Sequence, residues 1–296
     1  MRIDTTLVTV VAVLAGVILL VIMVLFLLRR LIGRGTRIPL GRGYYFRRWV
    51  EPTDPETCSY IVGVMQALCR DSVGCLLPHP ALQGNIKELH NKTVFVCYDK
   101  SGDPVMFNMM LRPSNPPGME GCIINHLGLV IVANKAKGKG MQKLTILNAV
   151  LQIISLRSLN IYITDIGDSP SAARLVPTYL TDPFPDYTRP EKMPAEHQVR
   201  IFNHMLENHR KDMGISANAQ PNPDNFVVKY SNEPTGGGSV PLAAFSRERH
   251  SRTKCVNSFF YDRVVPEDYD ELFLLGTLDL TCLNRVIAGK LIKKKM

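Results

Sequence analysis

The stretch LVIVANKAKGKGMQKL, from Leu129 to Leu144, carries the strongest signal of fold in this chain. An apolar run typical of a buried strand leads into two glycines that alternate with lysines, and a helical pattern follows directly. A turn between a strand and a helix aims several backbone N–H groups at one place, with the positive end of the helix dipole behind them. Glycine lets the main chain approach an anion closely because it has no Cβ. We therefore expect Lys137, Gly138, Lys139 and Gly140 to bind a phosphate group.

Two common phosphate-binding loops do not fit this turn. The pattern GxxxxGK[ST] is absent, and Met141 follows Gly140 where a P-loop would place a hydroxyl for magnesium. The fingerprint GxGxxG is absent as well, and the residues before the turn predict a hairpin rather than a βα unit. The turn is therefore neither a P-loop nor a dinucleotide-binding fingerprint.

The elements expected around the turn form an α/β domain with a mixed sheet. A capping box at Thr53–Glu56 predicts the start of a helix, and a polar turn over residues 99–103 separates two runs rich in β-branched and aromatic residues. The expected order is a helix over about 54–70, a hairpin of 92–98 and 105–111, a buried strand over 122–132, a helix from Met141 to Ile154, a strand over 159–163, a short helix over 169–175, a helix near 197–213 and two strands near 255–261 and 271–279.

A segment of a different kind precedes this domain. Residues 5–28 contain no charged side chain, and their length matches the hydrocarbon core of a bilayer, which is about 30 Å thick. The run ends in LLRR rather than in a small-residue cleavage site, so a secretory signal is not expected. We expect residues 1–28 to form a single transmembrane anchor.

The charges beside this span predict its orientation. Only Arg2 and Asp4 precede it, whereas seven arginines and no acid lie between Arg29 and Arg48. The positive-inside bias therefore places the large C-terminal part in the cytoplasm. The chain ends in KKKM, which resembles the dilysine retrieval signal of endoplasmic reticulum membrane proteins; a plain solvated tail is the alternative. Residues 29–52 are expected to form a basic juxtamembrane linker, with its aromatic residues at the membrane interface: Tyr44, Tyr45, Phe46 and Trp49.

Charge and cysteine usage exclude several classes of protein. The net charge of +9 comes from the two ends, because the body between them is slightly acidic. We expect the basic ends to contact anionic lipids and expect no nucleic-acid partner. Seven cysteines without a CxxC pair indicate a reducing compartment. No metal is expected, because His197, His204 and His209 lack the i, i+4 spacing of a helical metal site.

The strand, turn and helix resemble the central motif of the GNAT superfamily of N-acetyltransferases. The family pattern, roughly LxVxPxxRGKGIGxxL, reads LVIVANKAKGKGMQKL here, with Lys137 at the arginine position and Gln142 in place of a small residue. A second register aligns Lys135, Gly138 and Gly140 and restores the small residue, but it shifts the turn by two positions. The resemblance implies a GNAT-like domain over residues 53–296, with a central mixed sheet flanked by helices and with residues 181–250 as an insertion.

This resemblance also implies a function, which is transfer of an acyl group from acetyl-CoA or another acyl-CoA to an amine by direct attack. The acyl-CoA would lie where the central strand and the next strand separate. Ile131 and Val132 would pair with its pantetheine arm, and Ser169 stands where the family often has an asparagine that contacts the cofactor. The pyrophosphate would accept from the backbone N–H groups of Lys137, Gly138, Lys139, Gly140 and Gln142.

Three side chains are candidates for proton transfer in such a reaction. His126, on the central strand, would be the general base, with a purely structural role as the alternative, and Glu120 is a second candidate. Tyr179 would protonate the leaving thiolate, although it lies beyond Pro177, one turn later than the family's usual tyrosine. The amine would belong to a small molecule, a protein or a lipid. The main alternative is a GNAT-fold binding or scaffold module that is tethered to the membrane without catalysis, and a long-chain acyltransferase is a third reading.

Overall fold

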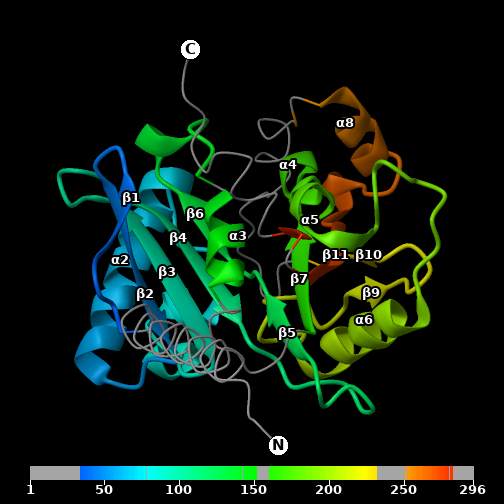
Figure 1. The fold of residues 1–296 in the computed structure, drawn as a ribbon, viewed down its shortest axis with the longest axis horizontal. Helices are drawn as coiled ribbons and strands as arrows, with labels where there is room; N and C mark the ends of the chain where they lie inside the picture. Colours follow the sequence, from blue (N-terminus) through cyan, green and yellow to red (C-terminus); the bar gives the residue numbers. More distant parts are fainter. Residues whose placement is uncertain are drawn as a thin grey trace, which may run out of the picture.

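In the part of the chain that the structure describes, eleven strands form one mixed sheet with helices on both of its faces (Figure 1). The computed structural model describes residues 34–77, 79–141, 143–151, 160–231, 251, 253–279 and 281–282. The α/β architecture with a mixed sheet that we expected is confirmed, because one strand pair is parallel and the other pairs are antiparallel. The order is β1-β2-β3-β4-β5-β7-β11-β10-β9, with β6 paired to β4 and β8 paired to β11. The strands are β1 (Ile38–Gly41), β2 (Tyr44–Val50), β3 (Lys92–Tyr98), β4 (Pro104–Leu111), β5 (Ile123–His126), β6 (Val130–Val132), β7 (Ile161–Gly167), β8 (Thr181–Phe184), β9 (Gln220–Pro221), β10 (Val227–Lys229) and β11 (Glu271–Leu278).

The helices divide between the two faces of the sheet. Lys92, Leu111, His126, Thr164 and Leu275 are register partners across five strands, so their side chains share one face. On that face one helix, α2, packs over β3 and β4, and another, α6, packs around β11. Four other helices, α3, α4, α5 and α8, share an apolar cluster with the opposite side of β7. The helices are α2 (Pro55–Val73), α3 (Lys143–Val150), α4 (Pro170–Ala173), α5 (Leu175–Tyr179), α6 (Glu196–Asn208) and α8 (Lys254–Tyr261), with short 3-10 helices η1 (Pro80–Gln83), η2 (Ile86–Leu89), η3 (Asn134–Ala136) and η6 (Pro266–Asp268).

The first long helix, α2, begins and ends at residues suited to helix termini. The Oδ2 atom of Asp54 accepts the amide of Thr57 at 2.8 Å, and Pro55 occupies the first helical position, where its missing N–H is not needed. The helix ends at Gly74, whose φ of 85° is accessible to glycine at little cost. The expected helix is confirmed and runs to Val73, but its N-cap is Asp54 bonded to Thr57 and not the capping box expected at Thr53–Glu56.

The expected hairpin of β3 and β4 is also confirmed. Seven residues of β3 pair with β4, and the Oδ1 atom of Asp99 accepts the amides of Ser101 and Asp103 at 3.0 and 3.1 Å in the turn. An aspartate that binds its own turn in this way explains why the polar segment at 99–103 predicted the turn correctly.

The long strand expected over residues 122–132 is wrong in one respect, because the structure divides it into β5 and β6. Gly128 lies between them with a φ of 58°, and a Cβ at this position would overlap the carbonyl oxygen of Met109. The chain therefore leaves the sheet geometry here and rejoins it at Val130.

Several later elements are present with bounds that differ from the expected ones. The strand expected over 159–163 is β7, which extends to Gly167, and the short helix expected over 169–175 is two segments, α4 and α5. The helix near 197–213 is α6, which ends at Asn208. The helix after the glycine turn is described to Val150, so its expected end at Ile154 lies outside the described residues.

The linker expected over residues 29–52 is wrong where the structure describes it. Residues 38–50 form β1 and β2, and β2 pairs with β3 from Tyr45 to Val50. The aromatic residues that we expected at a membrane interface lie in the fold instead: Tyr45 stacks on Tyr98, and Trp49 is 7% exposed. The sequence YYFRRWV does not reveal this strand by its polarity, because Arg48 is buried, as Phe46 is.

The strand expected near 255–261 is wrong as well, because this segment is helix α8. Its buried residues, Val256, Phe259 and Phe260, follow helical spacing on one side. Aromatic and β-branched content suggested a strand, but the apolar period is that of a helix. Besides β7, the antiparallel partners of β11 are β8 and β10 from residues 181–231, and β9 pairs with β10.

No helix within the described ranges is both long and apolar enough to span a bilayer. The anchor expected over residues 1–28 lies outside those ranges.

Candidate functional site

The candidate site lies where two neighbouring strands stop pairing. β5 and β7 run side by side up to His126 and Thr164, and the amide of Leu127 makes one further bond to the carbonyl of Thr164 at 2.8 Å. Beyond this point β6 pairs with β4, whereas β7 pairs with β11. No strand of the described chain pairs with the other edge of β6. An edge of this kind presents backbone groups to an extended ligand.

The glycine turn lies at the end of β6, directly before α3. Gly138 and Gly140 have φ values of 74° and 77°, which glycine adopts readily. A Cβ on Gly138 would have nothing within 4 Å, so this side of the turn is open. Within the described chain, no group accepts a hydrogen bond from the amide of either glycine. The amides of Gly138 and Gly140 are therefore without an acceptor in the described chain, whereas the amide of Lys139 donates to the carbonyl of Ala136 at 3.3 Å.

The three lysines near this turn have different surroundings. Lys135 Nζ lies 2.7 Å from Asp99 Oδ2 and 2.9 Å from Asp103 Oδ2, and these hydrogen bonds raise its pKa to about 12. Lys137 Nζ donates to the carbonyl of Ser72 at 3.1 Å. The ammonium group of the exposed Lys139 has no partner among the described residues.

A buried chain of polar side chains links the helix after the turn to the point where the strands separate. Arg48 Nε donates to Asn148 Oδ1 at 2.7 Å, and Asn148 Nδ2 donates to Asn108 Oδ1 at 2.7 Å. Asn108 Nδ2 in turn donates to the carbonyl of Leu127 at 2.5 Å. Burial lowers the pKa of Arg48 to about 10. This chain joins β2, α3 and β4 to the break before Gly128, and nothing in the sequence analysis had indicated it.

His126 stands at the end of β5 in a closed environment. The side chain is 1% exposed, its Nδ1 lies 3.1 Å from Thr164 Oγ1, and its Nε2 has no partner in the described chain. Burial, followed by the nearby Lys92, His209 and His79, lowers its pKa to about 3. The imidazole is therefore neutral at physiological pH.

The other expected catalytic residues lie apart from His126. Glu120 is in an exposed loop, where the Gly118 amide and its own amide lower its pKa by hydrogen bonding. Tyr179 ends α5, and burial raises the pKa of its hydroxyl. Within the described chain no hydrogen bond joins Glu120, Tyr179 and His126.

The expected ligand contacts are placed as follows. Ile131 and Val132 lie on β6, where their backbones pair with Phe107 and Met106 of β4 and their other edge faces the gap. Ser169 is the 2%-exposed residue before α4, and its carbonyl accepts the amide of Ala173 at 3.0 Å. Gln142 lies outside the described residues.

Asp165 is a residue at the gap that the sequence analysis missed. It follows Thr164 on β7, immediately beyond the last bond to β5, and its side chain is largely buried. Burial is the first cause of a pKa well above the ordinary value, and the charges of Glu271 and Asp168 add to it, although the amide of Ile166 donates to its Oδ1 at 3.0 Å and opposes the shift. An acid within the apolar run IYITDIG was the available signal.

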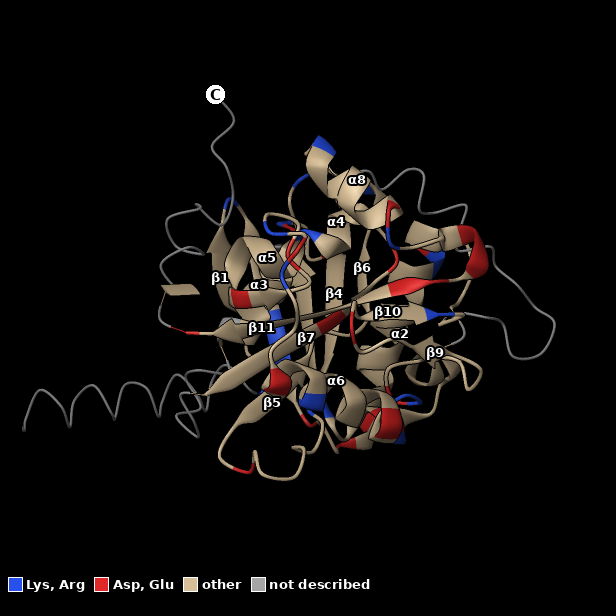
Figure 2. Ribbon diagram, turned by 90° about the vertical axis from the view of Figure 1, so that its right-hand side faces the viewer, with Lys and Arg blue, Asp and Glu red and all other residues tan. Residues whose placement is uncertain are grey.

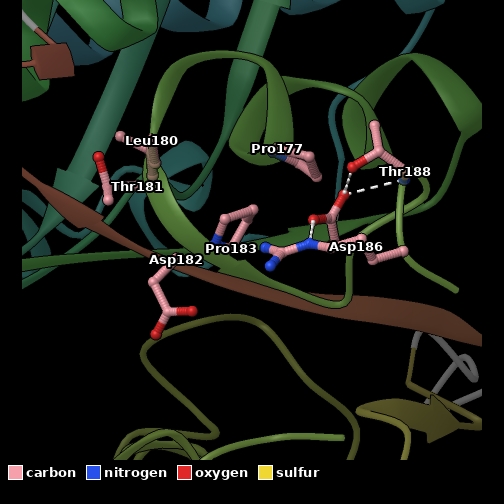
Figure 3. Close-up of a pocket in the computed structure, with 8 residues that line it drawn as sticks. Pro177, Leu180, Thr181, Asp182, Pro183, Asp186 and Thr188 are labelled. Atoms are coloured by element: carbon pink, nitrogen blue, oxygen red, sulfur yellow. Dashed lines mark hydrogen bonds and ion pairs between the residues drawn. The ribbon is translucent and has the colours of Figure 1, made fainter. Parts of the chain in front are cut away.

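A cavity of about 440 Å³ lies away from the glycine turn, where α5 leads into β8 (Figure 3). Asp186 is its most buried carboxylate, and the side chains of Thr188 and Arg189 turn toward it, with Arg189 Nε at 3.0 Å. Burial raises the pKa of Asp186, but these hydrogen bonds outweigh burial and hold it below the ordinary value. The carboxylate is therefore a partnered structural group. A second cavity, of about 10 Å³, lies beside the glycine turn and is lined by Leu40, Tyr44, Cys97, Lys139, Gly140, Met141 and Leu144.

Comparisons with known proteins give only structural similarity. No protein-family model matches the chain, and no curated protein matches its sequence. An aminoglycoside acetyltransferase from an uncultured soil metagenomic sample, solved with sisomicin, has a TM-score of 0.31 at 15% identity over 43% of this chain and 79% of its own. A possible acetyltransferase from Clostridium difficile 630 has a TM-score of 0.27 at 15% identity over 37% of this chain and 70% of its own. A GNAT family acetyltransferase from Brucella melitensis, solved with acetyl-CoA, has a TM-score of 0.26 at 15% identity over 40% and 74%. TM-scores of this size do not establish a shared fold.

Proposed function

We propose that this protein is an acyl-CoA-dependent N-acyltransferase of the GNAT type, with acetyl-CoA as the expected co-substrate. One observation carries the proposal: the parallel strands β5 and β7 separate at Leu127, and the free edge of β6 leads into the glycine turn at the start of α3. A pantetheine arm is an extended chain with amide groups, which fits the free edge, and its pyrophosphate fits a helix N-terminus.

Different residues of the gap would bind the pantetheine arm and the pyrophosphate of the acyl-CoA. The backbones of Ile131 and Val132 would pair with the pantetheine amides, because β4 occupies their opposite edge. The amides of Gly138 and Gly140, followed by Gln142, would bind the pyrophosphate, with charge supplied by the exposed Lys139. Lys137 has no free donor in this arrangement, because its amide donates to the carbonyl of Ala133 at 3.1 Å and its ammonium group donates to the carbonyl of Ser72. Ser169, before α4, completes the expected contacts.

The acyl-CoA supplies a thioester carbonyl, which an amine attacks so that a C–N bond forms and the C–S bond breaks. The amine nitrogen then loses a proton and the leaving sulfur gains one. His126 is our proposed acceptor of the first proton, because Nε2 has no partner in the described chain, although burial lowers its pKa to about 3 and so weakens it as a base. Asp165 is our proposed donor of the second, because burial raises the pKa of its carboxyl well above the ordinary value and the residue lies at the edge of the gap. Glu120 and Tyr179 are the alternative base and acid.

We further propose that residues 5–28 tether the domain to a membrane, with the C-terminal part in the cytoplasm. The support is the uncharged apolar run and the arginines that follow it. Tethering would raise the local concentration of lipid and membrane-protein amines, and either of these or a small amine would serve as the acceptor.

A module that binds acyl-CoA without turnover is the second candidate. His126 is almost fully enclosed, and the cavity beside the glycine turn has a volume of only about 10 Å³. Both observations favour a site that holds its ligand without giving an acceptor access to it.

Turnover distinguishes these two functions. The full-length protein is mixed with acetyl-CoA and, in turn, a polyamine, a lysine peptide and vesicles containing phosphatidylethanolamine, while free thiol and acetylated amine are measured. Equal amounts of thiol and acetylated product, lost in Gly138→Glu, would support the transferase. Binding without product for every amine class would favour the module.

A further inference from the structure

A serine, a histidine and an aspartate from two distant segments form a second cluster on the face covered by α6. Ser114 Oγ lies 2.9 Å from His209 Nε2. The other ring nitrogen of His209, Nδ1, lies 3.4 Å from Asp212 Oδ2. Ser114 follows β4, and the two other residues follow α6, so the fold rather than the local sequence brings them together.

A second histidine determines the direction of these hydrogen bonds. His204 Nε2 lies 3.1 Å from the carbonyl oxygen of Ser114 and 3.2 Å from its Oγ. A carbonyl can only accept, so His204 Nε2 carries a hydrogen and donates to Ser114. His204 Nδ1 then accepts from Asn208 Nδ2 at 3.2 Å, which is the consistent tautomer.

Because His204 Nε2 donates, the hydroxyl hydrogen of Ser114 is available to His209 Nε2, 2.9 Å away. With that nitrogen as acceptor, His209 Nδ1 carries the other hydrogen and donates it to Asp212. The order hydroxyl, imidazole, carboxylate is the arrangement that activates a serine as a nucleophile.

The cluster is held by contacts on both of its sides. Pro113 and Pro116 restrict the backbone around Ser114, and Asn115 Nδ2 donates to the carbonyl of Cys122 at 2.8 Å. His209 ends α6 with its amide bonded to the carbonyl of Met205 at 3.0 Å. In Figure 2, the ribbon of α6 carries both basic residues, in blue, and acidic residues, in red.

The Asp212 carboxylate is surrounded by basic groups. Besides His209, its charge acts on Lys92 and His79, and in both it opposes the lowering of the pKa that burial causes. Lys92 starts β3 and pairs with Leu111, the last residue of β4 before the Ser114 loop.

We propose that Ser114 and His209, positioned by Asp212, form a nucleophilic centre that hydrolyses small carboxylic esters. Ser114 Oγ attacks the ester carbonyl, its proton moves to His209 Nε2, and the ester C–O bond breaks as that proton passes to the leaving alcohol. Water then attacks the acyl-serine, gives a proton to His209 and releases the acid, and His209 returns the proton to Ser114. The net reaction consumes one ester and one water.

Donors for the oxyanion lie next to the nucleophile. The backbone amides of Ser114 and Asn115 donate to no group of the described chain. His204 Nε2–H is a third donor, 3.2 Å from Ser114 Oγ. Ser114 is exposed, so small esters with good leaving groups can reach it without a deep pocket.

This centre does not depend on the acyl-CoA function, and covalent labelling tests it. The full-length protein is treated with a fluorophosphonate, which forms a P–O bond with an activated serine and releases fluoride, and mass spectrometry then locates the adduct. We expect the adduct at Ser114, at least about tenfold less of it in His209→Gln, and none at the exposed Ser101, which serves as the internal control.

Hydrolysis of p-nitrophenyl acetate gives the second readout. We expect Ser114→Ala to fall to the background rate, and Asp212→Asn to lose kcat at little change in KM, with acetyl-CoA binding unchanged in both. An adduct no more frequent at Ser114 than at Ser101, with the circular dichroism of the variants unaltered, would show instead that the hydroxyl only ties the loop to α6 and would overturn the proposal.

Discussion

At the scale of single residues, the buried histidines are the groups that respond most to pH. Burial lowers the pKa of His126 to about 3 and that of His79 to about 4, from an ordinary value of 6.5. At pH values between each lowered pKa and 6.5, the unfolded chain binds more protons than the folded one. The free energy of unfolding must therefore fall as the pH falls through this window.

We predict that His126→Gln makes the protein less sensitive to acid. In the unaltered protein, moving from pH 7 to pH 5 should cost about 2 kcal/mol of unfolding free energy through this one histidine. The His126→Gln variant should not show this decrease in unfolding free energy between pH 7 and pH 5. The control variant His90→Gln, at an exposed position, should show the same decrease as the unaltered protein. Urea unfolding at the two pH values measures the difference, and equal pH dependence in His126→Gln and the unaltered protein would contradict the burial described here.

The residues of the candidate site were predictable only where their signal is local. Gly138 and Gly140 have the positive φ values that a glycine turn implies, and their position in the sequence was sufficient to locate them. The enclosure of His126 and the network through Asn148 depend on residues far away in the chain, and Ser114 meets His209 across 95 positions. Spacing along the sequence carries no information about contacts of that kind.

At the scale of elements, the position of α3 beside the gap depends on polar contacts as well as on apolar packing. Asn148 is fully buried, accepts from Arg48 and donates to Asn108, which holds the carbonyl of Leu127. A substitution of Asn148 that removes its side-chain oxygen would leave the Nε–H of the buried Arg48 without a hydrogen-bond acceptor.

We predict that Asn148→Ala lowers the free energy of unfolding by about 3 kcal/mol, because it leaves both Arg48 and Asn108 unsatisfied. The matched control is Asn203→Ala, on the exposed side of α6, which should change stability by less than about 0.5 kcal/mol. Chemical denaturation of both variants makes the comparison. A loss below about 1 kcal/mol in Asn148→Ala would show that the polar chain contributes little.

Elements with local start and stop signals were predictable, and elements defined by distant partners were not. The cap at Asp54 and the turn at Asp99 are formed by neighbours in sequence, so α2 and the β3–β4 hairpin follow from the sequence. The break at Gly128 requires the carbonyl of Met109, which the apolar run around Gly128 does not reveal. The segment of α8 was expected to be a strand. It is a helix, because Val256, Phe259 and Phe260 are buried together on one helix face.

At the scale of the whole molecule, the folded domain begins earlier than its composition suggests. β2 pairs with β3 over residues 45–50, and Phe46 stacks on Phe95 with ring centroids 4.7 Å apart. The arginine-rich segment that resembled a linker is therefore part of the sheet. Likewise, the segment that resembled an insertion supplies β8 and β10, both partners of β11.

Two deletions test this boundary. Removing residues 1–33 should leave a soluble, cooperatively unfolding protein, because every described element remains. Removing residues 1–50 should give aggregated protein, because it takes away β1 and β2, uncovers the edge of β3 and removes Arg48 from the polar chain. Size-exclusion chromatography and circular dichroism would show the difference, and a folded monomer without residues 1–50 would place the boundary after β2.

Binding of acetyl-CoA at the glycine turn is the central claim, and calorimetric titration of the full-length protein tests it most directly. Gly84→Glu is the matched control for Gly138→Glu, since Gly84 also has a positive φ, of 86°, and open space where a Cβ would lie. We predict one molecule bound per chain in the micromolar range, binding weakened at least about tenfold by the Gly138 change, which places a carboxylate beside the pyrophosphate, and unaltered binding in the control. No binding at millimolar acetyl-CoA to the folded protein, or equal binding by both variants, would contradict the account.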